Sequence, residues 1–318
     1  GARPIDQHLQ GLAAMGADIE VREGYVHASA ARLCGSRISF DMPTVGGTEN
    51  LLMAAALADG ETVLENAARE PEIVALAELL QRMGVPIEGA GTSTIRIEGQ
   101  DALSGAEVRV IPDRIEAGTW LIAAAATGGE VRVTSCRPDH IEVLLEKLIQ
   151  AGCQIDVDET RIELSAPERL QPCDIRTAPF PGFPTDLQAQ WMSLMAVADG
   201  ATEIIETIFE NRFMHVPELM RMGAQIRVTG NVAVVRGPNR LSGAPVMATD
   251  LRASAGLVIA ALAASGTTEI LRIYHLERGY ERLDAKLRAL GADVELFVRD
   301  ATVAHVNAAQ AAEDRRTT

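Results

Sequence analysis

The stretch LAAMGADIEV, at positions 12–21, decides the fold because its pattern returns four more times along the chain. The later copies read LQRMGVPIEG (80–89), LIQAGCQIDV (148–157), LMRMGAQIRV (219–228) and LRALGADVEL (287–296). In each copy an apolar helical segment ends at a glycine, and a strand-like segment follows. A glycine there can adopt the left-handed conformation that ends many helices. The interval of about 70 residues predicts a chain that repeats one structural unit.

A second pattern, out of phase with the first, joins an Ala-rich helix to a β-branched strand. It reads LLMAAALADGETVLEN (51–66), WLIAAAATGGEVRVTS (120–135), WMSLMAVADGATEIIET (191–207) and LVIAALAASGTTEILRI (257–273). A helix that is apolar on most of its faces is a buried helix, whereas the amphipathic helix predicted at 73–83 belongs outside. We therefore expect an α/β protein with buried helices inside and sheets outside.

The composition indicates a folded, soluble chain and excludes several classes of protein. Of the 318 residues, 47% are hydrophobic and 23% are charged, which supplies a packed core. The net charge of −15 repels nucleic-acid duplexes and anionic membranes. The longest apolar runs fall far short of the ~20 residues that cross a bilayer. The four cysteines form no C-x-x-C pair, so we expect reduced thiols, no metal site and a cytoplasmic location.

Polar residues stand just before the predicted buried helices, in TVGGTEN (44–50), PDRIEAGT (112–119), FPTDLQAQ (183–190) and ATDLRASA (248–255). We predict N-caps at Thr48, Thr119, Asp186 and Asp250. Several helix starts that meet at one end of a domain would offer free N–H groups and positive dipole ends to an anion. Arg114 and Arg252 would oppose those dipoles, which also favours a bound anion. Capping alone remains the simpler explanation of the Thr and Asp residues.

Longer motifs at these places resemble one enzyme family. They are ENAAREPEI (65–73), PDRIEAGT (112–119), RTAPFPGFPTDLQAQ (176–190), FENRFMHVPELMRMGA (209–224), MATDLRASA (247–255) and YHLERGYERLDAKLRALGA (274–292). Together they resemble the UDP-N-acetylglucosamine enolpyruvyl transferases of bacterial peptidoglycan synthesis, from Gly1 to about Asn307. The resemblance implies a two-domain inside-out α/β barrel built of repeated units. We expect an incomplete first domain over residues 1–111, a second over 112–307 and a flexible tail over 308–318.

The resemblance also implies a reaction. The enolpyruvyl group of phosphoenolpyruvate passes to the 3′-hydroxyl of UDP-N-acetylglucosamine, and phosphate leaves, by addition and elimination through a tetrahedral intermediate. In the family this step commits material to peptidoglycan and so serves cell wall biogenesis, cell shape and cell division. Both substrates are anions, in agreement with the site expected from the helix starts. The implied partners are these small molecules, with no metal or organic cofactor, nucleic acid or membrane.

Several residues match the family's positions around the reacting atoms. Asp186 matches the carboxylate that takes the proton of the 3′-hydroxyl, a role in which the base must reach that hydroxyl directly. The arginines that match positions around phosphoenolpyruvate are Arg212, Arg252 and Arg278, and each can bind a carboxylate or phosphate through paired hydrogen bonds. Asp250 could orient Arg252, and Arg114 fits a place near the interdomain hinge. We interpret His215, in FMHVPEL, as structural.

A second set of residues matches contacts to the sugar nucleotide. Arg3 matches an arginine at the end of a mobile loop that contacts phosphate. The stretch that matches the uridine site comprises Pro4, Ile5, Asp6 and Gln7, and a further nucleotide contact matches Met42, Pro43, Thr44 and Val45. Some family members carry lysine at the place of Met42, so a charged contact is lost or replaced here. Ile208 matches a backbone contact to the same ligand.

One part of the family pattern is missing. The family carries a reactive cysteine, its proton donor, on a loop just before a G-A-R-P motif, and here that motif occupies residues 1–4. None of the four cysteines, which are Cys34, Cys136, Cys153 and Cys173, stands in a matching place. We therefore expect the chain to be a fragment that lacks turnover by itself.

Two other functions remain open at this point. The shikimate-pathway enolpyruvyl transferases share the fold and the chemistry but act on a small shikimate phosphate, and the motif at 209–219 favours the nucleotide-sugar enzymes over them. A non-catalytic module that keeps nucleotide-sugar affinity would explain the missing cysteine loop. The presence of Asp186 with its neighbouring arginines argues against that module.

Overall fold

A computed structural model describes residues 5–297 of the chain. The chain divides into a first unit, Gly1–Leu276, and a second unit, Glu277–Thr318. The predicted tail at 308–318 lies outside the described residues. In the second unit the helix α9 (Leu283–Ala289) is followed by residues 292–297, in which no strand forms. All other elements named below, apart from the last residues of the 3₁₀ helix η3 (Ile273–Arg278), belong to the first unit.

The glycines that end the repeated helices adopt the predicted left-handed conformation. The φ angles are +93° at Gly16, +105° at Gly84, +101° at Gly152, +99° at Gly223 and +94° at Gly291. The helices before them are α1 (Asp6–Ala14), α3 (Pro71–Arg82), α5 (Glu142–Gln150), α7 (Val216–Arg221) and α9. The strands that follow the first four are β1 (Asp18–Arg22), β5 (Ile87–Glu88), β8 (Gln154–Asp158) and β12 (Gln225–Thr229). The predicted repeat is thus confirmed as a structural repeat.

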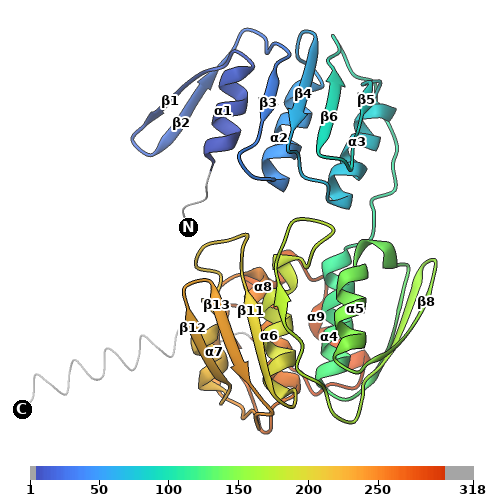
Figure 1. Cartoon of the computed structure of the whole chain (residues 1–318), viewed down its shortest axis with the longest axis vertical. Coiled ribbons are helices and arrows are strands. Elements are labelled where there is room, and N and C mark those ends of the chain that lie inside the picture. The colour runs from blue at the N-terminus through green and yellow to red at the C-terminus, as the bar shows by residue number, and fades with distance from the viewer. Residues whose placement is uncertain (1–4, 298–318) are drawn as a thin grey trace, which may run out of the picture. The chain divides into compact units, whose positions relative to one another are not determined.

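The sheets repeat one topology (Figure 1). The first four-stranded sheet has the order β3-β4-β6-β5, with β3 (Arg37–Ser39), β4 (Glu61–Glu65) and β6 (Thr94–Glu98). The second has the order β10-β11-β13-β12, with β10 (Ile175–Arg176), β11 (Ala201–Ile205) and β13 (Val232–Arg236). In both sheets the first two strands are parallel and the remaining pairs are antiparallel. The same chain path therefore builds both sheets.

The remaining strands form smaller sheets. An antiparallel hairpin joins β1 to β2 (Tyr25–Ser29), and β7 (Glu130–Thr134), β9 (Arg161–Ser165) and β8 form a three-stranded sheet. A parallel pair consists of β14 (Pro245–Met247) and β15 (Glu269–Leu271). A short 3₁₀ turn, η1 (Pro138–His140), precedes α5.

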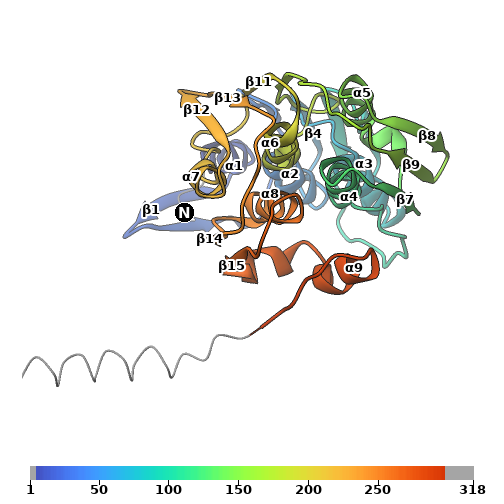
Figure 2. The same cartoon turned by 90° about the horizontal axis from the view of Figure 1, so that it is seen from below.

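Buried helices occupy the interior, as predicted. They are α4 (Arg114–Ala126), α6 (Gln188–Val197) and α8 (Leu251–Leu262). The fourth predicted buried helix, α2 (Val45–Ala55), is only partly buried, with Met53 51% exposed. Figure 2 shows α4, α6 and α8 grouped together with strands β7, β9, β11 and β13 outside them. The hydroxyl of Ser193, in the middle of α6, donates to the carbonyl of Gly256, in the middle of α8 (2.8 Å). Because Arg252 at the start of α8 also reaches Asp186 just before α6, these two helices run in the same direction.

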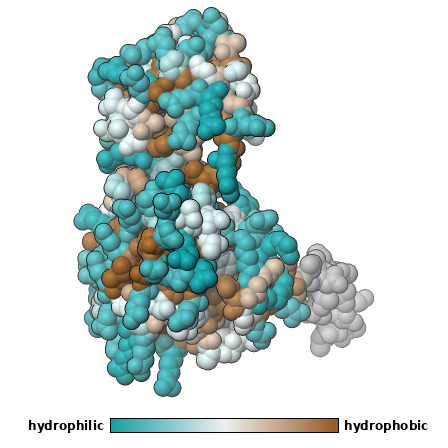
Figure 3. Space-filling model, turned by 90° about the vertical axis from the view of Figure 1, so that its right-hand side faces the viewer, coloured by the Kyte–Doolittle hydropathy of each residue, from teal (hydrophilic) through white to brown (hydrophobic). Residues whose placement is uncertain are grey.

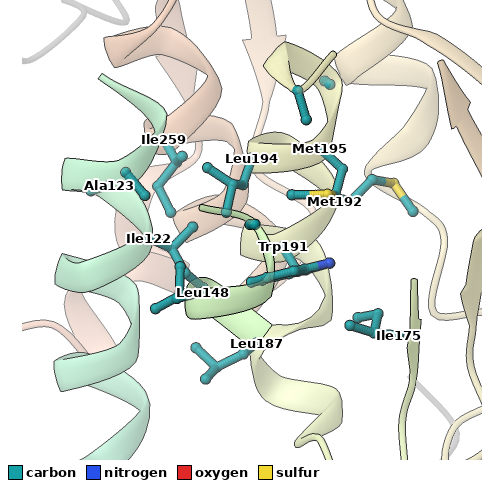
Figure 4. Close-up of a cluster of buried hydrophobic side chains, with 14 of the residues drawn as sticks. Ile122, Ala123, Leu148, Ile175, Leu187, Trp191, Met192, Leu194, Met195 and Ile259 are labelled. Atoms are coloured by element: carbon teal, nitrogen blue, oxygen red, sulfur yellow. The ribbon is translucent and has the colours of Figure 1, made fainter. Parts of the chain in front are cut away.

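Two hydrophobic clusters form within the described residues. The larger one contains Trp191, Leu187 and Leu194 of the α6 region together with residues of α4 and α8 (Figure 4). The smaller one contains Leu51 and Leu52 of α2. Hydrophilic residues predominate on the face drawn in Figure 3, as the charge content requires. Among the described helices, none is long and apolar enough to span a membrane.

Three of the four predicted N-caps are wrong. Asp250 does cap α8, but Thr44 caps α2 and Asp113 caps α4. Thr48 and Thr119 lie inside their helices, where the Thr48 hydroxyl accepts from the N–H of Ala68 (3.0 Å) and that of Thr119 donates to the carbonyl of Ile115 (2.8 Å). A threonine inside a helix can use its hydroxyl for bonds of either kind, so its presence does not mark a helix start. Asp186 binds arginines instead of capping.

Candidate active site

Asp186 lies in the short 3₁₀ helix η2 (Thr185–Leu187), directly before α6. Phe183 and Leu187, on either side, are buried (2% and 0% exposed), so apolar packing anchors both ends of this turn. Pro184 between them has an extended backbone and cannot continue a helix backwards. The carboxylate of Asp186 remains 37% exposed at the start of a buried helix. The turn thus presents a reachable base next to a positive dipole end.

Two arginines hold this carboxylate. Nη2 of Arg212 lies 2.9 Å from Oδ1 of Asp186, and Nε of Arg252 lies 3.0 Å from Oδ2. Their side chains are 20% and 16% exposed, so both ion pairs are partly shielded from water. Two guanidinium groups thus converge on one partly exposed carboxylate, in a geometry that can also bind the oxygens of an anion. The structure therefore brings three of the predicted site residues into direct contact.

Asp250 fixes the backbone that carries Arg252. Its Oδ1 accepts hydrogen bonds from the N–H groups of Arg252 and Ala253 (both 2.9 Å). The neighbouring His215 is 1% exposed, and desolvation lowers the pKa of its imidazole to about 4, although Asp250 acts in the opposite direction. His215 is therefore neutral at pH 7. Its burial fits the structural role expected for it.

A hydrogen bond brings together the two stretches that are predicted to contact the nucleotide, at 5–7 and 42–45. Oε1 of Gln7 accepts from the N–H of Asp41 (2.9 Å), which directly precedes Met42. Ile5 and Met42 are 40% and 49% exposed, and Asp6 is exposed as well. An open hollow of about 190 Å³ adjoins this place, lined by Gln7, Gln10, Gly11, Ala14, Arg37, Ile38, Ser39 and Phe40. Pro43, Thr44 and Val45 are half-buried at the start of α2, while Arg3 and Pro4 lie outside the described residues.

Arg114 and Arg278 occupy other positions. Arg114 is the first residue of α4, and its Nε lies 2.9 Å from Oε1 of Glu72 in α3. Its guanidinium also stacks over the ring of Phe180 at 5.7 Å, and its side chain is 11% exposed. The Glu72 carboxylate therefore offsets the positive charge of Arg114 at the N-terminus of α4, and the expected role of a bound anion there is taken by the protein itself. Arg278 ends η3 and belongs to the second unit.

Sequence reasoning missed Glu206. This residue follows β11 and is 2% exposed, yet its carboxylate hydrogen-bonds to Thr185 and to the N–H of Ile208. The available signal was an acidic residue at the end of the apolar run ATEIIET (201–207), because a buried carboxylate has to be paired. The pattern did not reveal its partners, which come from separate segments.

Three of the four cysteines are unsuited to proton transfer. Cys136, Cys153 and Cys173 are buried, and burial raises the pKa of each thiol, to about 11 for Cys153. Cys34 is exposed. Across residues 5–297, no group of three or more His, Cys, Asp or Glu side chains could hold a metal ion. The chemistry visible at the site is that of a carboxylate and guanidinium groups.

We predict that one thiol reacts in the native protein. A maleimide at pH 7 should modify Cys34 rapidly, because the thiolate is the nucleophile and the other three thiols are buried with raised pKa values. Intact-mass spectrometry should count one label in buffer and four in denaturant, and the Cys34→Ser variant should take none in buffer. Rapid labelling at two or more sites would contradict the burial described.

Comparisons with known proteins identify one family of similar enzymes. The model of the EPSP synthase (3-phosphoshikimate 1-carboxyvinyltransferase) family matches residues 1–287. The UDP-N-acetylglucosamine 1-carboxyvinyltransferase of Geotalea daltonii is 59% identical over 295 residues, which are 93% of this chain and 71% of that protein. The protein of the same name from Myxococcus xanthus is 58% identical over 294 residues, or 92% of this chain and 70% of the relative.

Solved structures give the same result. The enolpyruvyl transferase NikO from Streptomyces tendae superposes with a TM-score of 0.84 at 30% identity, covering 92% of this chain and 72% of that one. EPSP synthase from Acinetobacter baumannii has a TM-score of 0.70 at 19% identity, covering 92% and 72%, and supports the fold alone. With its inside-out α/β architecture, the chain belongs to the EPSP synthase family of enolpyruvyl transferases.

Proposed function

We propose that this chain serves the transfer of the enolpyruvyl group of phosphoenolpyruvate to the 3′-hydroxyl of UDP-N-acetylglucosamine. The observation that carries the proposal is the Asp186 carboxylate, which Arg212 and Arg252 hold at the start of a buried helix. The curated relatives named above bear the matching name, UDP-N-acetylglucosamine 1-carboxyvinyltransferase. In the cell the activity would belong to the cytoplasm and would serve peptidoglycan synthesis, and with it cell shape and division.

Asp186 is the proposed base. It removes the proton of the 3′-hydroxyl while that oxygen bonds to C2 of phosphoenolpyruvate and a general acid gives its proton to C3, which yields a tetrahedral ketal. The conjugate base of that acid then takes a proton back from C3 as the C2–O bond to phosphate breaks, so the vinyl double bond forms again and phosphate leaves. Arg212 and Arg252 attract the phosphate and carboxylate charges and stabilise them as the bonds change.

The remaining assignments follow the same proposal. The stretches at 5–7 and 42–45 would hold the sugar nucleotide, together with Arg3, Pro4 and Ile208. Arg278 would be a third arginine for phosphoenolpyruvate, and Arg114 would act by fixing α4 to α3 through Glu72. The two hydrophobic clusters support a first domain that ends near residue 111 and a second that begins at 112.

Ligand binding tests the proposed function. UDP-N-acetylglucosamine at 100-fold above its Kd should stabilise the folded chain by about 2.7 kcal/mol, and shikimate 3-phosphate should leave it unchanged. Differential scanning fluorimetry with both ligands over a concentration series measures this. A coupled assay measures phosphate release when phosphoenolpyruvate is added to the same chain.

Each result has a clear meaning. Stabilisation by shikimate 3-phosphate in place of the sugar nucleotide would make the chain a shikimate-pathway transferase. Stabilisation by neither ligand would contradict the proposed function. Binding with rapid phosphate release would support the reaction and would overturn the expectation that the chain lacks turnover.

A further inference from the structure

Glu206 is a buried acid that the proposed chemistry does not use. Its side chain is 2% exposed. Two hydrogen bonds join its backbone to Asn231: the Glu206 N–H donates to the Asn231 carbonyl, and the Asn231 side-chain amide donates to the Glu206 carbonyl (both 2.9 Å). Among the described residues, four groups donate to its carboxylate: the hydroxyls of Thr177 and Thr185 (both 2.8 Å) and the N–H groups of Ile208 (2.7 Å) and Phe209 (3.2 Å). These bonds compensate the burial of the charge.

The donors belong to the two segments that form the candidate active site. Thr185 directly precedes Asp186, and Ile208 and Phe209 begin the segment that ends at Arg212. The guanidinium of Arg212 lies over the ring of Phe209 at 5.0 Å and reaches Asp186 at 2.9 Å. The contacts therefore close a ring that runs from Glu206 through Thr185 and Asp186 to Arg212 and back through Phe209.

The two carboxylate oxygens of Glu206 bond to different segments of the candidate active site. Oε2 accepts from Thr185 and so holds the turn that carries Asp186. Oε1 accepts from Thr177, Ile208 and Phe209 and so holds the segment that carries Arg212. Thr177 is itself fully buried and accepts from the N–H of Thr207 at 2.8 Å, which ties that segment down a second time. One rigid carboxylate thus sets the spacing between the proposed base and its arginine.

We propose that Glu206 is a positioning residue, which holds Asp186 opposite Arg212. Because the N–H of Ile208 already donates to Glu206, the carbonyl of Ile208 is left as the backbone group through which Ile208 contacts the ligand. The identity of that ligand, a nucleoside diphosphate sugar, rests on the proposed function. The spacing that Glu206 imposes on the two segments does not rest on it, and can be measured without a ligand.

Substitutions at Glu206 separate hydrogen bonding from charge. In Glu206→Gln, the amide oxygen can accept the three bonds of Oε1, and the amide NH₂ can donate to the hydroxyl oxygen of Thr185. Glu206→Ala removes every acceptor. Thr185→Val keeps the size and shape of the side chain and removes the bond to Oε2 alone. Glu203, on the same strand but exposed, gives the matched control Glu203→Ala.

Hydrogen–deuterium exchange and calorimetry on the full chain test the inference. In the peptide that covers 207–212, amide exchange should be at least tenfold faster in Glu206→Ala than in the wild type, and within threefold of the wild type in Glu206→Gln and Glu203→Ala. The Kd for UDP-N-acetylglucosamine should rise at least tenfold in Glu206→Ala and three- to tenfold in Thr185→Val. It should change less than threefold in Glu206→Gln and Glu203→Ala.

The outcomes are distinguishable. If Glu206→Ala folds and exchanges like the wild type, or if Glu206→Gln is as damaging as Glu206→Ala, the positioning role is overturned. If Glu206→Ala does not fold, Thr185→Val decides, and an unchanged Kd overturns the inference. If the wild type binds no sugar nucleotide, the proposed function fails, while the exchange rates of Glu206→Ala and Glu206→Gln in the 207–212 peptide still decide the role of Glu206.

Discussion

Asp186→Asn should raise the affinity of the chain for inorganic phosphate about three- to tenfold while it abolishes the proposed base. The carboxylate now neutralises part of the charge of Arg212 and Arg252, which it contacts at 2.9 and 3.0 Å. An amide of the same shape removes the negative charge that both guanidinium groups contact. At a few ångströms in a partly exposed site, removal of one charge is worth at least about 1 kcal/mol, which corresponds to this gain. Isothermal titration with phosphate measures it.

The same substitution should lower any phosphate release that the chain supports by about 10²- to 10⁴-fold, the usual contribution of a positioned base. The matched control is Asp199→Asn, which alters an exposed aspartate that faces Arg169 at 3.8 Å. The control should change neither phosphate affinity nor turnover, because an exposed pair is screened by water. Weaker phosphate binding in Asp186→Asn would show that Asp186 does not compete with anions for these arginines.

The repeat was predictable because its signal is local. A glycine after an apolar helical segment specifies a left-handed residue wherever it occurs, and Gly16, Gly84 and Gly152 all adopt it. The buried and outer helices were predictable for a similar reason, since the apolar pattern of a helix reflects which of its faces are buried. The resemblance then assigned the functions of the individual residues.

The helix starts were predicted less well because capping depends on backbone position to within one residue. The cap of α4 is Asp113, whereas Thr119 lies in the interior of the helix and bonds to Ile115. The motif contains both residues, and composition does not distinguish them. Asp186 looked like a cap, but its partners are Arg212 and Arg252, which lie 26 and 66 residues away. Such contacts arise only when distant segments fold together.

The charge on Arg114 shows the same difficulty. An arginine at a helix N-terminus opposes the dipole, and this suggested a bound anion. The structure supplies a carboxylate of the protein itself, Glu72, at 2.9 Å. The motif that contains Glu72 was recognised, but nothing in the sequence pattern pairs it with Arg114. Arg252 likewise faces a carboxylate of the protein, Asp186, at 3.0 Å, so its place at a helix start does not by itself indicate a bound anion.

Trp191→Ala should destabilise the protein by about 3–5 kcal/mol, the largest stability effect that we expect from one substitution. Trp191 of α6 is completely buried in the larger hydrophobic cluster (Figure 4). Its ring meets that of Phe183 edge to face with centroids 5.6 Å apart. Its Nε1–H donates to the carbonyl of Cys173 (3.1 Å). The substitution leaves a cavity between buried helices and an unpaired carbonyl. Urea unfolding followed by circular dichroism measures the loss.

The second tryptophan provides the control. Trp120 in α4 is half-buried, and its Nε1–H donates to Oε1 of Glu116 (3.2 Å), so Trp120→Ala should cost about 1 kcal/mol. The loss of stability in Trp191→Phe should lie between the losses in the two alanine variants, because the phenyl ring fills most of the space but cannot donate to the carbonyl of Cys173. Phe183 stands three residues before Asp186, so loss of Trp191 should also weaken sugar-nucleotide binding, whereas loss of Trp120 should not. Equal destabilisation by both alanine variants would show that the interior is not organised around α6.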